Sequence, residues 1–113
     1  MQSFEQGAVV RVPFPYTDRA TRQFRPALVV STGRMLDEHG LLWVAMITSA
    51  ENRGWRGDFE IKQLAQAGLP VASVIRSAKI ATIEAADAGR LGKISPALLR
   101  QVLRQIVAEL QER

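Results

Sequence analysis

The chain has 113 residues, enough for one domain with a modest hydrophobic core, so a single domain spanning residues 1–113 is expected. It contains no cysteine, which excludes disulfides, thiolate nucleophiles and cysteine-ligated zinc. Lys and Arg outnumber Asp and Glu by 15 to 11, and the resulting formal charge of +4 suits a polyanionic partner. The sequence begins without a signal-peptide pattern, and no apolar run approaches the roughly 20 residues that cross a bilayer. A cytoplasmic location is therefore expected.

Short apolar and β-branched runs, separated by turn residues, make up most of the chain. Strands are expected, in chain order, over residues 8–13, 24–31, 41–47 and 58–61, as two extended pieces within 71–84, and near 90–94. The strand over 41–47 is apolar on both faces, so it should be central in the sheet. The polar stretches 16–23 and 32–40 are expected to be loops, and residues 62–67 a single helical turn.

The C-terminal segment carries the clearest helical pattern. Ser95 is a favourable N-cap and Pro96 suits the first helical position. Apolar residues then recur at three- and four-residue steps: Leu98, Leu99, Val102, Leu103, Ile106, Val107 and Leu110. The helix should pack on the sheet through this stripe. The whole pattern predicts a mainly β fold, a small and strongly bent antiparallel sheet or open barrel with a C-terminal helix.

A cation and two hydroxyls stand at the ends of two neighbouring predicted strands. Arg25 precedes Pro26, which pushes it towards extended backbone at the entrance of one strand, and Thr48 and Ser49 end the next. Read alone, Arg25 would more often be an ordinary surface residue. Adjacent strand residues point to opposite faces, so the two hydroxyls cannot both face one ligand, and one of them is a candidate to cap the following turn. The arrangement nevertheless forms a plausible anion site.

Two other segments are candidates for contact with a polyanion. The polar, basic stretch 16–23 lies directly before Arg25 and is either a lid over the anion site or an ordinary surface loop. Further on, Arg53 and Arg56 flank Trp55, a combination suited to base stacking and phosphate contact. The alternative is that Trp55 closes one end of the barrel.

A metal site is not expected. Asp37, Glu38 and the only histidine, His39, are consecutive in a predicted loop, which gives poor ligand geometry, and nothing nearby completes a site.

Several short motifs in a fixed order resemble the MazF/PemK family of bacterial toxins. They are Gly7 with Val9-Val10, Pro13-Phe14-Pro15, Arg25-Pro26-Ala27-Leu28-Val29, Ile47-Thr48-Ser49, Gly57-Asp58, Gly68-Leu69-Pro70, Ser73 with Arg76, Lys79-Ile80 with Thr82-Ile83, and Gly92 before the helix. The resemblance covers nearly the whole chain. It implies an SH3-like open barrel of short antiparallel strands with a C-terminal α-helix, a homodimer, and a cognate antitoxin protein as partner.

The resemblance also implies an activity: sequence-specific endoribonuclease cleavage of single-stranded RNA, that is mRNA, without metal or other cofactor. In the family pattern Arg25 and Thr48 are the catalytic pair. The candidate RNA-binding residues are Thr17, Arg22, Ser49, Arg53, Arg56, Arg76 and Lys79. Two positions depart from the pattern, with Ala8 where an acidic residue is usual and Ala78 where some members carry a carboxylate beside the residue matching Arg76.

Metal-independent cleavage uses the 2′-hydroxyl of the substrate and leaves a 2′,3′-cyclic phosphate and a 5′-hydroxyl. Arg25 suits the stabilisation of charge on the phosphoryl oxygens but is a poor base, because its pKa lies far above neutrality. Thr48 suits hydrogen bonding to the phosphate or to the 2′-hydroxyl. The proton acceptor is left open between a carboxylate, the partner subunit and water. The competing interpretation is a non-catalytic SH3-like module that binds nucleic acid or an antitoxin.

Overall fold

The computed structural model describes residues 4–14 and 23–112, and the structural statements below concern those residues. The strands are β1 Ala8–Phe14, β2 Gln23–Val29, β3 Leu41–Ser49, β4 Asp58–Ile61, β5 Ser73–Glu84 and β6 Gly89–Lys93. The helices are α1 Gly33–His39, α2 Leu64–Ala67 and α3 Pro96–Leu110, with single 3₁₀ turns η1 Ala50–Asn52 and η2 Ala85–Asp87.

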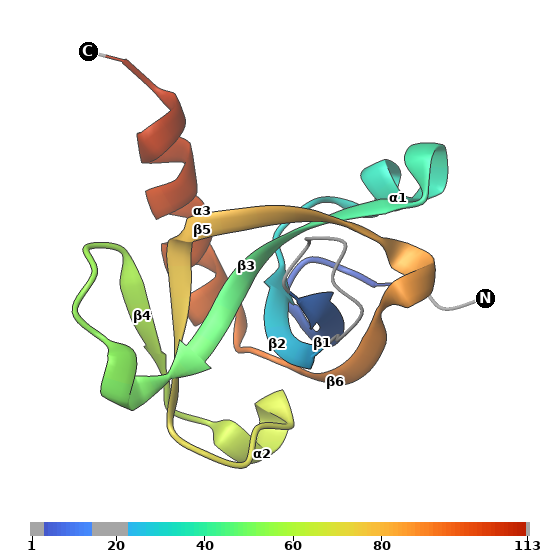
Figure 1. The fold of residues 1–113 in the computed structure, drawn as a ribbon. Helices are drawn as coiled ribbons and strands as arrows, with labels where there is room; N and C mark the ends of the chain where they lie inside the picture. The colour runs from blue at the N-terminus through green and yellow to red at the C-terminus, as the bar shows by residue number, and fades with distance from the viewer. Residues whose placement is uncertain (1–3, 15–22, 113) are drawn as a thin grey trace.

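The strands form one antiparallel sheet in the order β4-β5-β3-β2-β1-β6, so β3 lies inside the sheet as predicted. The sheet curls strongly, and Figure 1 shows the long strand β5 crossing the molecule while β1, β2 and β6 curve round to face it. The two extended pieces predicted within 71–84 are one strand. Its pairing with β3 shifts from Ala45↔Ile80 to Met46↔Arg76, and this bulge at residues 77–79 bends β5.

Two apolar clusters occupy the two faces of the curled sheet. One includes Val10, Val29 and Val44, and the other joins Leu28 and Ile75 to α3 through Val102. The predicted helix is confirmed over Pro96–Leu110, and the Ser95 hydroxyl accepts a hydrogen bond from the Leu98 N–H at 3.2 Å. The helix packs on the sheet through Leu98, Leu99, Val102, Leu103 and Ile106, whereas Val107 and Leu110 of the predicted stripe are exposed. Within the described residues no helix is both long and apolar enough to span a bilayer.

The stretch 32–40, predicted to be a loop, is partly helical. Residues Gly33–His39 form α1, which ends at Gly40 in the left-handed region with φ of 67°. The helix buries none of its residues, and its partly buried Leu36 only touches the first apolar cluster. A sequence stretch with so little apolar content carries no clear helical period, which explains why the pattern did not predict α1.

Candidate functional site

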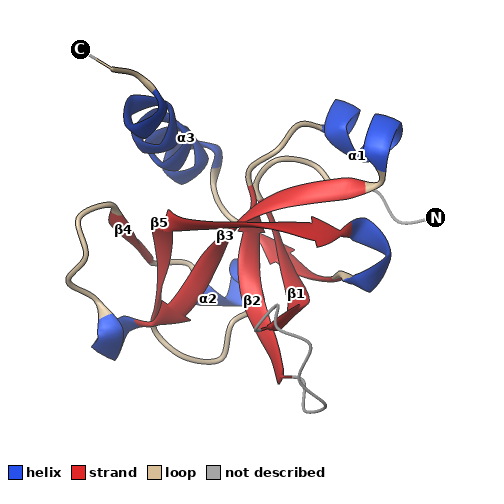
Figure 2. Ribbon diagram, turned by 45° about the horizontal axis from the view of Figure 1, so that its top comes forward, coloured by secondary structure: helices blue, strands red, loops and turns tan. Residues whose placement is uncertain are grey.

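Strands β2 and β3 bring the two candidate catalytic residues to the same end of the sheet. Their ladder runs Val29↔Val44, Leu28↔Ala45 and Ala27↔Met46. The same register continued by two residues would set Arg25 opposite Thr48. The ladder stops at Ala27, beside Pro26, which has no N–H to donate. Figure 2 shows the two strands diverging from there towards the lower side of the view, where β2 begins and β3 ends.

Arg25 and Thr48 lie on the same face of the sheet. Side chains alternate along a strand, so Arg25 shares a face with Ala27 and Thr48 shares a face with Met46. Ala27 and Met46 belong to one apolar cluster, which places both candidate residues beyond the rim of that cluster. Arg25 is exposed and Thr48 is partly buried. Both groups are therefore open to a ligand from one side.

Pairing with β1 fixes the backbone of Arg25. The β1–β2 ladder continues past the point where β3 departs, and Arg25 lies opposite Val12 in it. Its guanidinium Nη2 donates to the Gln23 amide oxygen at 3.3 Å. On the other face, the Arg11 guanidinium stacks over the exposed ring of Phe24, 4.2 Å from its centroid. The cation is thus carried by ordered strand rather than by a loop.

The Thr48 hydroxyl has a partner that the sequence analysis missed. The side-chain amide of Asn52, Nδ2, donates to Thr48 Oγ1 at 3.0 Å. Ser49 precedes η1 without any side-chain cap to that turn, so Thr48 and not Ser49 is tied to the turn that follows β3. The only sequence signal was an amide four residues after a hydroxyl, which is too common to single out.

Arg76, on β5, makes several contacts with residues at and before the start of β4. Its Nε donates to Asp58 Oδ1 at 3.1 Å, and its Nη2 donates to Asp58 Oδ2 at 3.0 Å and to the Asn52 carbonyl at 2.7 Å. The guanidinium also stacks on Trp55, 4.0 Å from the ring centroid. The two charged side chains are only 11% and 7% exposed. Arg76 is therefore held by protein groups on several sides.

The same contacts shift the pKa values of Asp58 and Arg76. Hydrogen bonds from Arg76, and further ones from the Trp55 and Gly54 N–H groups, lower the pKa of Asp58 below its ordinary value, outweighing the effect of burial. The bond to Asp58 raises the pKa of Arg76. Asp58 is thus ionised at neutral pH and weakly basic.

The other candidate RNA-binding residues that the structure describes lie in separate local environments. Arg53 folds back so that its Nη1 donates to the Ala50 carbonyl at 2.9 Å. Arg56 reaches α3, where its Nη1 lies 2.8 Å from a Glu109 carboxylate oxygen. Lys79 is exposed in the bulge of β5. Trp55 is 52% exposed and does not close the barrel. Thr17 and Arg22 lie outside the described residues.

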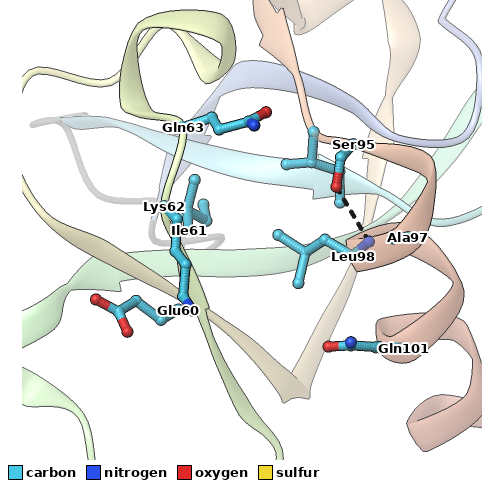
Figure 3. A pocket seen from close by; sticks show the side chains of 9 residues that line it. Glu60, Ile61, Lys62, Gln63, Ser95, Ala97, Leu98 and Gln101 are labelled. Carbon is cyan, nitrogen blue, oxygen red and sulfur yellow. Dashed lines mark hydrogen bonds between the residues drawn. The ribbon is translucent and has the colours of Figure 1, made fainter.

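A separate pocket of about 270 Å³ opens between β4, α2 and the start of α3. Figure 3 shows Glu60, Lys62 and Gln63 facing Leu98 and Gln101 across it. Of the candidate catalytic and RNA-binding residues that the structure describes, none lines this pocket. Among the residues that the structure describes, no group of three or more His, Asp and Glu side chains is placed to hold a metal ion.

The family model described as PemK-like, MazF-like toxin of type II toxin–antitoxin system matches residues 5–110. The fold agrees with the resemblance in the sequence, and this chain belongs to the PemK-like, MazF-like toxin family. No curated protein matches the sequence.

Solved structures match the fold across almost the whole chain. A MazE–MazF complex from Deinococcus radiodurans has a TM-score of 0.80 at 21% identity and covers 96% of this chain and 97% of its own. MazF from the same organism gives 0.78 at 20%, covering 97% and 98%. An endoribonuclease from a mycobacterial species gives 0.73 at 17%, covering 97% and 93%. The predicted fold class, an open barrel of short antiparallel strands with a C-terminal helix, is confirmed.

Proposed function

We propose that this chain is a toxin that cuts single-stranded mRNA at specific sequences, without a metal, through attack by the 2′-hydroxyl. Membership of the toxin family supports the general role, and a related fold is described as an endoribonuclease. The observation that supports the chemistry is the register of β2 and β3, which, continued by two residues past Ala27 and Met46, would set Arg25 opposite Thr48.

Arg25 acts on the scissile phosphate. Its guanidinium is planar and permanently charged, and it can hold two phosphoryl oxygens as negative charge builds on them. The paired backbone of β2 fixes its Cα before the substrate arrives, which lowers the cost of organising the site. Thr48 donates its hydroxyl proton to the phosphate or orients the attacking 2′-hydroxyl.

Asp58 is not the proton acceptor in this scheme. Arg76 and two backbone N–H groups already use both of its oxygens, and its lowered pKa makes it a weak base. Water or a group on a second subunit accepts the proton instead. The surrounding cations Arg53, Arg56 and Lys79, together with Thr17, Arg22 and Ser49, supply contacts along the RNA.

The proposed partners follow from the family. An antitoxin protein binds this chain, a proposal supported by the match of its fold to a MazE–MazF complex from Deinococcus radiodurans. The active form is a homodimer in the cytoplasm, and residues 1–113 act as one toxin domain. Expression of this chain alone should arrest growth, and co-expression of its antitoxin should relieve the arrest.

The decisive test is incubation of the purified protein with a long single-stranded RNA in EDTA. We expect discrete fragments that carry 2′,3′-cyclic phosphate and 5′-hydroxyl ends, identified by end-specific ligation and sequencing. RNA that is shifted in a gel but stays intact would overturn the nuclease proposal. That result would favour the non-catalytic binding module, an alternative that the departures at Ala8 and Ala78 make worth testing.

A further inference from the structure

We propose that Arg76 serves the Thr48 site indirectly, as a positioning residue that holds Asn52, and that Asn52 in turn orients the Thr48 hydroxyl. This inference rests on the proposed nuclease function and concerns how its site is assembled. In the family pattern Arg76 would be a residue that touches RNA. The contacts around it assign it a different task.

The carboxylate of Asp58 is the fixed point of this arrangement. It accepts Nε and Nη2 of Arg76, at 3.1 and 3.0 Å, and the N–H groups of Gly54 and Trp55, both at 3.2 Å. Each oxygen is thereby engaged, and Asp58 is almost fully buried. Charge-assisted bonds of this kind are about twice as strong as neutral ones. Asp58 therefore ties the loop before β4 to the cation on β5.

Arg76, held by Asp58, in turn holds the backbone of Asn52. Its Nη2 donates to the Asn52 carbonyl at 2.7 Å, which is shorter than either of its bonds to Asp58. With 11% of its side chain exposed, the guanidinium offers little surface to a phosphate. A second tether lies beside it, because the Ser77 hydroxyl donates to the Gly57 carbonyl at 2.6 Å. The backbone of the loop is thus held on two sides.

Asn52, held in this way, orients the hydroxyl of Thr48. Its backbone is fixed by Arg76, and its side-chain Nδ2 donates to Thr48 Oγ1 at 3.0 Å. A hydroxyl that accepts from an amide keeps its own proton to donate elsewhere. Its remaining donor is then available to the substrate, which is the role proposed for Thr48. Without Asn52 the hydroxyl would rotate among its staggered positions.

Trp55, which stacks on Arg76, is a candidate surface for base binding. One face of its ring lies on Arg76, yet the residue is 52% exposed. A ring fixed on one side and open on the other is suited to stacking with a nucleobase. Arg76 therefore supports both a stacking surface and the orientation of Thr48.

The carboxylate beside Arg76 comes from a neighbouring strand. Where some family members have an acidic residue two positions after this arginine, the chain has Ala78. Here the β4–β5 register sets Asp58 directly opposite Arg76. The substitution at position 78 thus leaves the cation paired, but with a carboxylate that is saturated by hydrogen bonds.

The first test compares Asn52→Ala, Thr48→Val and the double variant in the cleavage assay. Asn52→Ala removes an exposed amide and keeps the carbonyl that Arg76 binds. We expect kcat to fall about three- to tenfold with KM nearly unchanged, the scale of one hydrogen bond. In the Thr48→Val background the same change should have no further effect. Equal effects in both backgrounds would overturn the positioning role. Gln101→Ala, an exposed amide on α3, is the matched control and should match the wild type.

The second test asks whether Arg76 touches phosphate. Binding of a single-stranded oligonucleotide with methylated 2′-hydroxyls is measured over a range of salt concentrations for the wild type and Arg76→Gln. A lost phosphate contact lowers the slope of log K against log salt by about 0.7. A positioning residue leaves the slope unchanged while kcat falls. Circular dichroism checks folding, and Asn52→Ala gives an independent result if Arg76→Gln fails to fold.

A third readout follows Trp55 directly. In a Trp43→Phe background Trp55 is the remaining tryptophan, because the chain has two. We expect the oligonucleotide to quench its fluorescence in wild-type context and less so in Arg76→Gln. Wild-type protein that leaves RNA intact would refute the proposed function. Wild-type cleavage with normal kcat in both Asn52→Ala and Arg76→Gln would refute this inference alone.

Discussion

Arg25 and Arg76 are two arginines on neighbouring parts of one sheet with opposite surroundings. Arg25 is exposed at the start of β2, and its Nη2 donates to a neutral amide at 3.3 Å. Arg76 is 11% exposed and lies between a carboxylate, a carbonyl and an indole ring. The sequence analysis assigned Arg25 to catalysis and Arg76 to contact with RNA. In the structure the Arg25 side chain is exposed, whereas that of Arg76 binds the Asp58 carboxylate and the Asn52 carbonyl.

The difference follows from what each strand offers the side chain. At Arg25 the ladder between β2 and β3 has ended, so the side chain lies past the paired part of these two strands. At Arg76 the pairing with β4 sets Asp58 directly across, close enough for a forked contact. An arginine is thus exposed where β2 and β3 diverge, and an arginine is bound to a carboxylate where β4 and β5 pair. Each of the following changes tests this contrast.

Arg25→Ala should give the largest effect on activity. Losing one preorganised charge stabiliser typically costs about 100-fold or more in rate, so we expect cleavage in EDTA to fall by at least about 100-fold. The melting temperature should hardly change, because the side chain is exposed. Single-turnover cleavage and thermal denaturation measure the two quantities.

Arg100→Ala, an exposed arginine on α3, is the control for the loss of one positive charge. It should cleave within about twofold of the wild type, the range of exposed substitutions away from a site. Near-normal cleavage by Arg25→Ala would remove the assignment of Arg25 as catalytic.

Asp58→Asn should lower stability instead, by about 1–3 kcal/mol at pH 7, the usual cost of unpairing a buried hydrogen-bonded group. The effect depends on pH. The pKa of Asp58 is lowered by folding from an ordinary value of 3.8, so its carboxylate stabilises the fold above that value. This contribution is lost as the pH falls below 3.8 and through the folded pKa.

Urea denaturation of the wild type and Asp58→Asn at several pH values measures this contribution. The difference in free energy of unfolding should be largest near neutrality and shrink in acid. A difference that is the same at pH 7 and below pH 3.8 would show that the Asp58 charge does not contribute.

Sequence reasoning recovered the parts of the molecule that depend on local signals. The N-cap at Ser95 and the apolar residues after it define α3, and the strand predicted over 24–31 corresponds to β2, Gln23–Val29. These signals lie within a few residues of one another. They need no knowledge of the neighbouring strands.

The contacts that surround Arg76 could not be predicted in the same way. Asp58 and Arg76 lie far apart in the sequence, and they meet because β4 and β5 pair in a register that sets them opposite each other. The bond from Asn52 to Thr48 depends on one 3₁₀ turn whose side-chain directions no pattern encodes. Local pattern thus indicated which residue types matter but not which of them support one another.

Arg90→Ala should lower stability much less than Asp58→Asn. Arg90 forks onto Glu5 with bonds of 3.1 and 3.0 Å, the same geometry type as Arg76 with Asp58, but its side chain is 41% exposed and that of Glu5 is 58% exposed. Exposed pairs contribute about 1 kcal/mol or less and are screened by salt. The bond lowers the pKa of Glu5 from 4.5, so the small stabilisation is present above that value and fades in acid.

Urea denaturation at low and high salt measures the stabilisation by the Arg90–Glu5 pair. We expect Arg90→Ala to lose less than about 1 kcal/mol at low salt and almost nothing at about 1 M salt, where charges are screened within about 3 Å. Arg56→Ala is the matched variant, because its pair with Glu109 is exposed at 79% and 48% and lacks the fork. It should cost even less. Arg90→Ala could instead lower the free energy of unfolding as much as Asp58→Asn does. That result would mean that forked geometry, rather than burial, sets the strength of these ion pairs. Exposure could then no longer separate supporting arginines from ligand-binding ones.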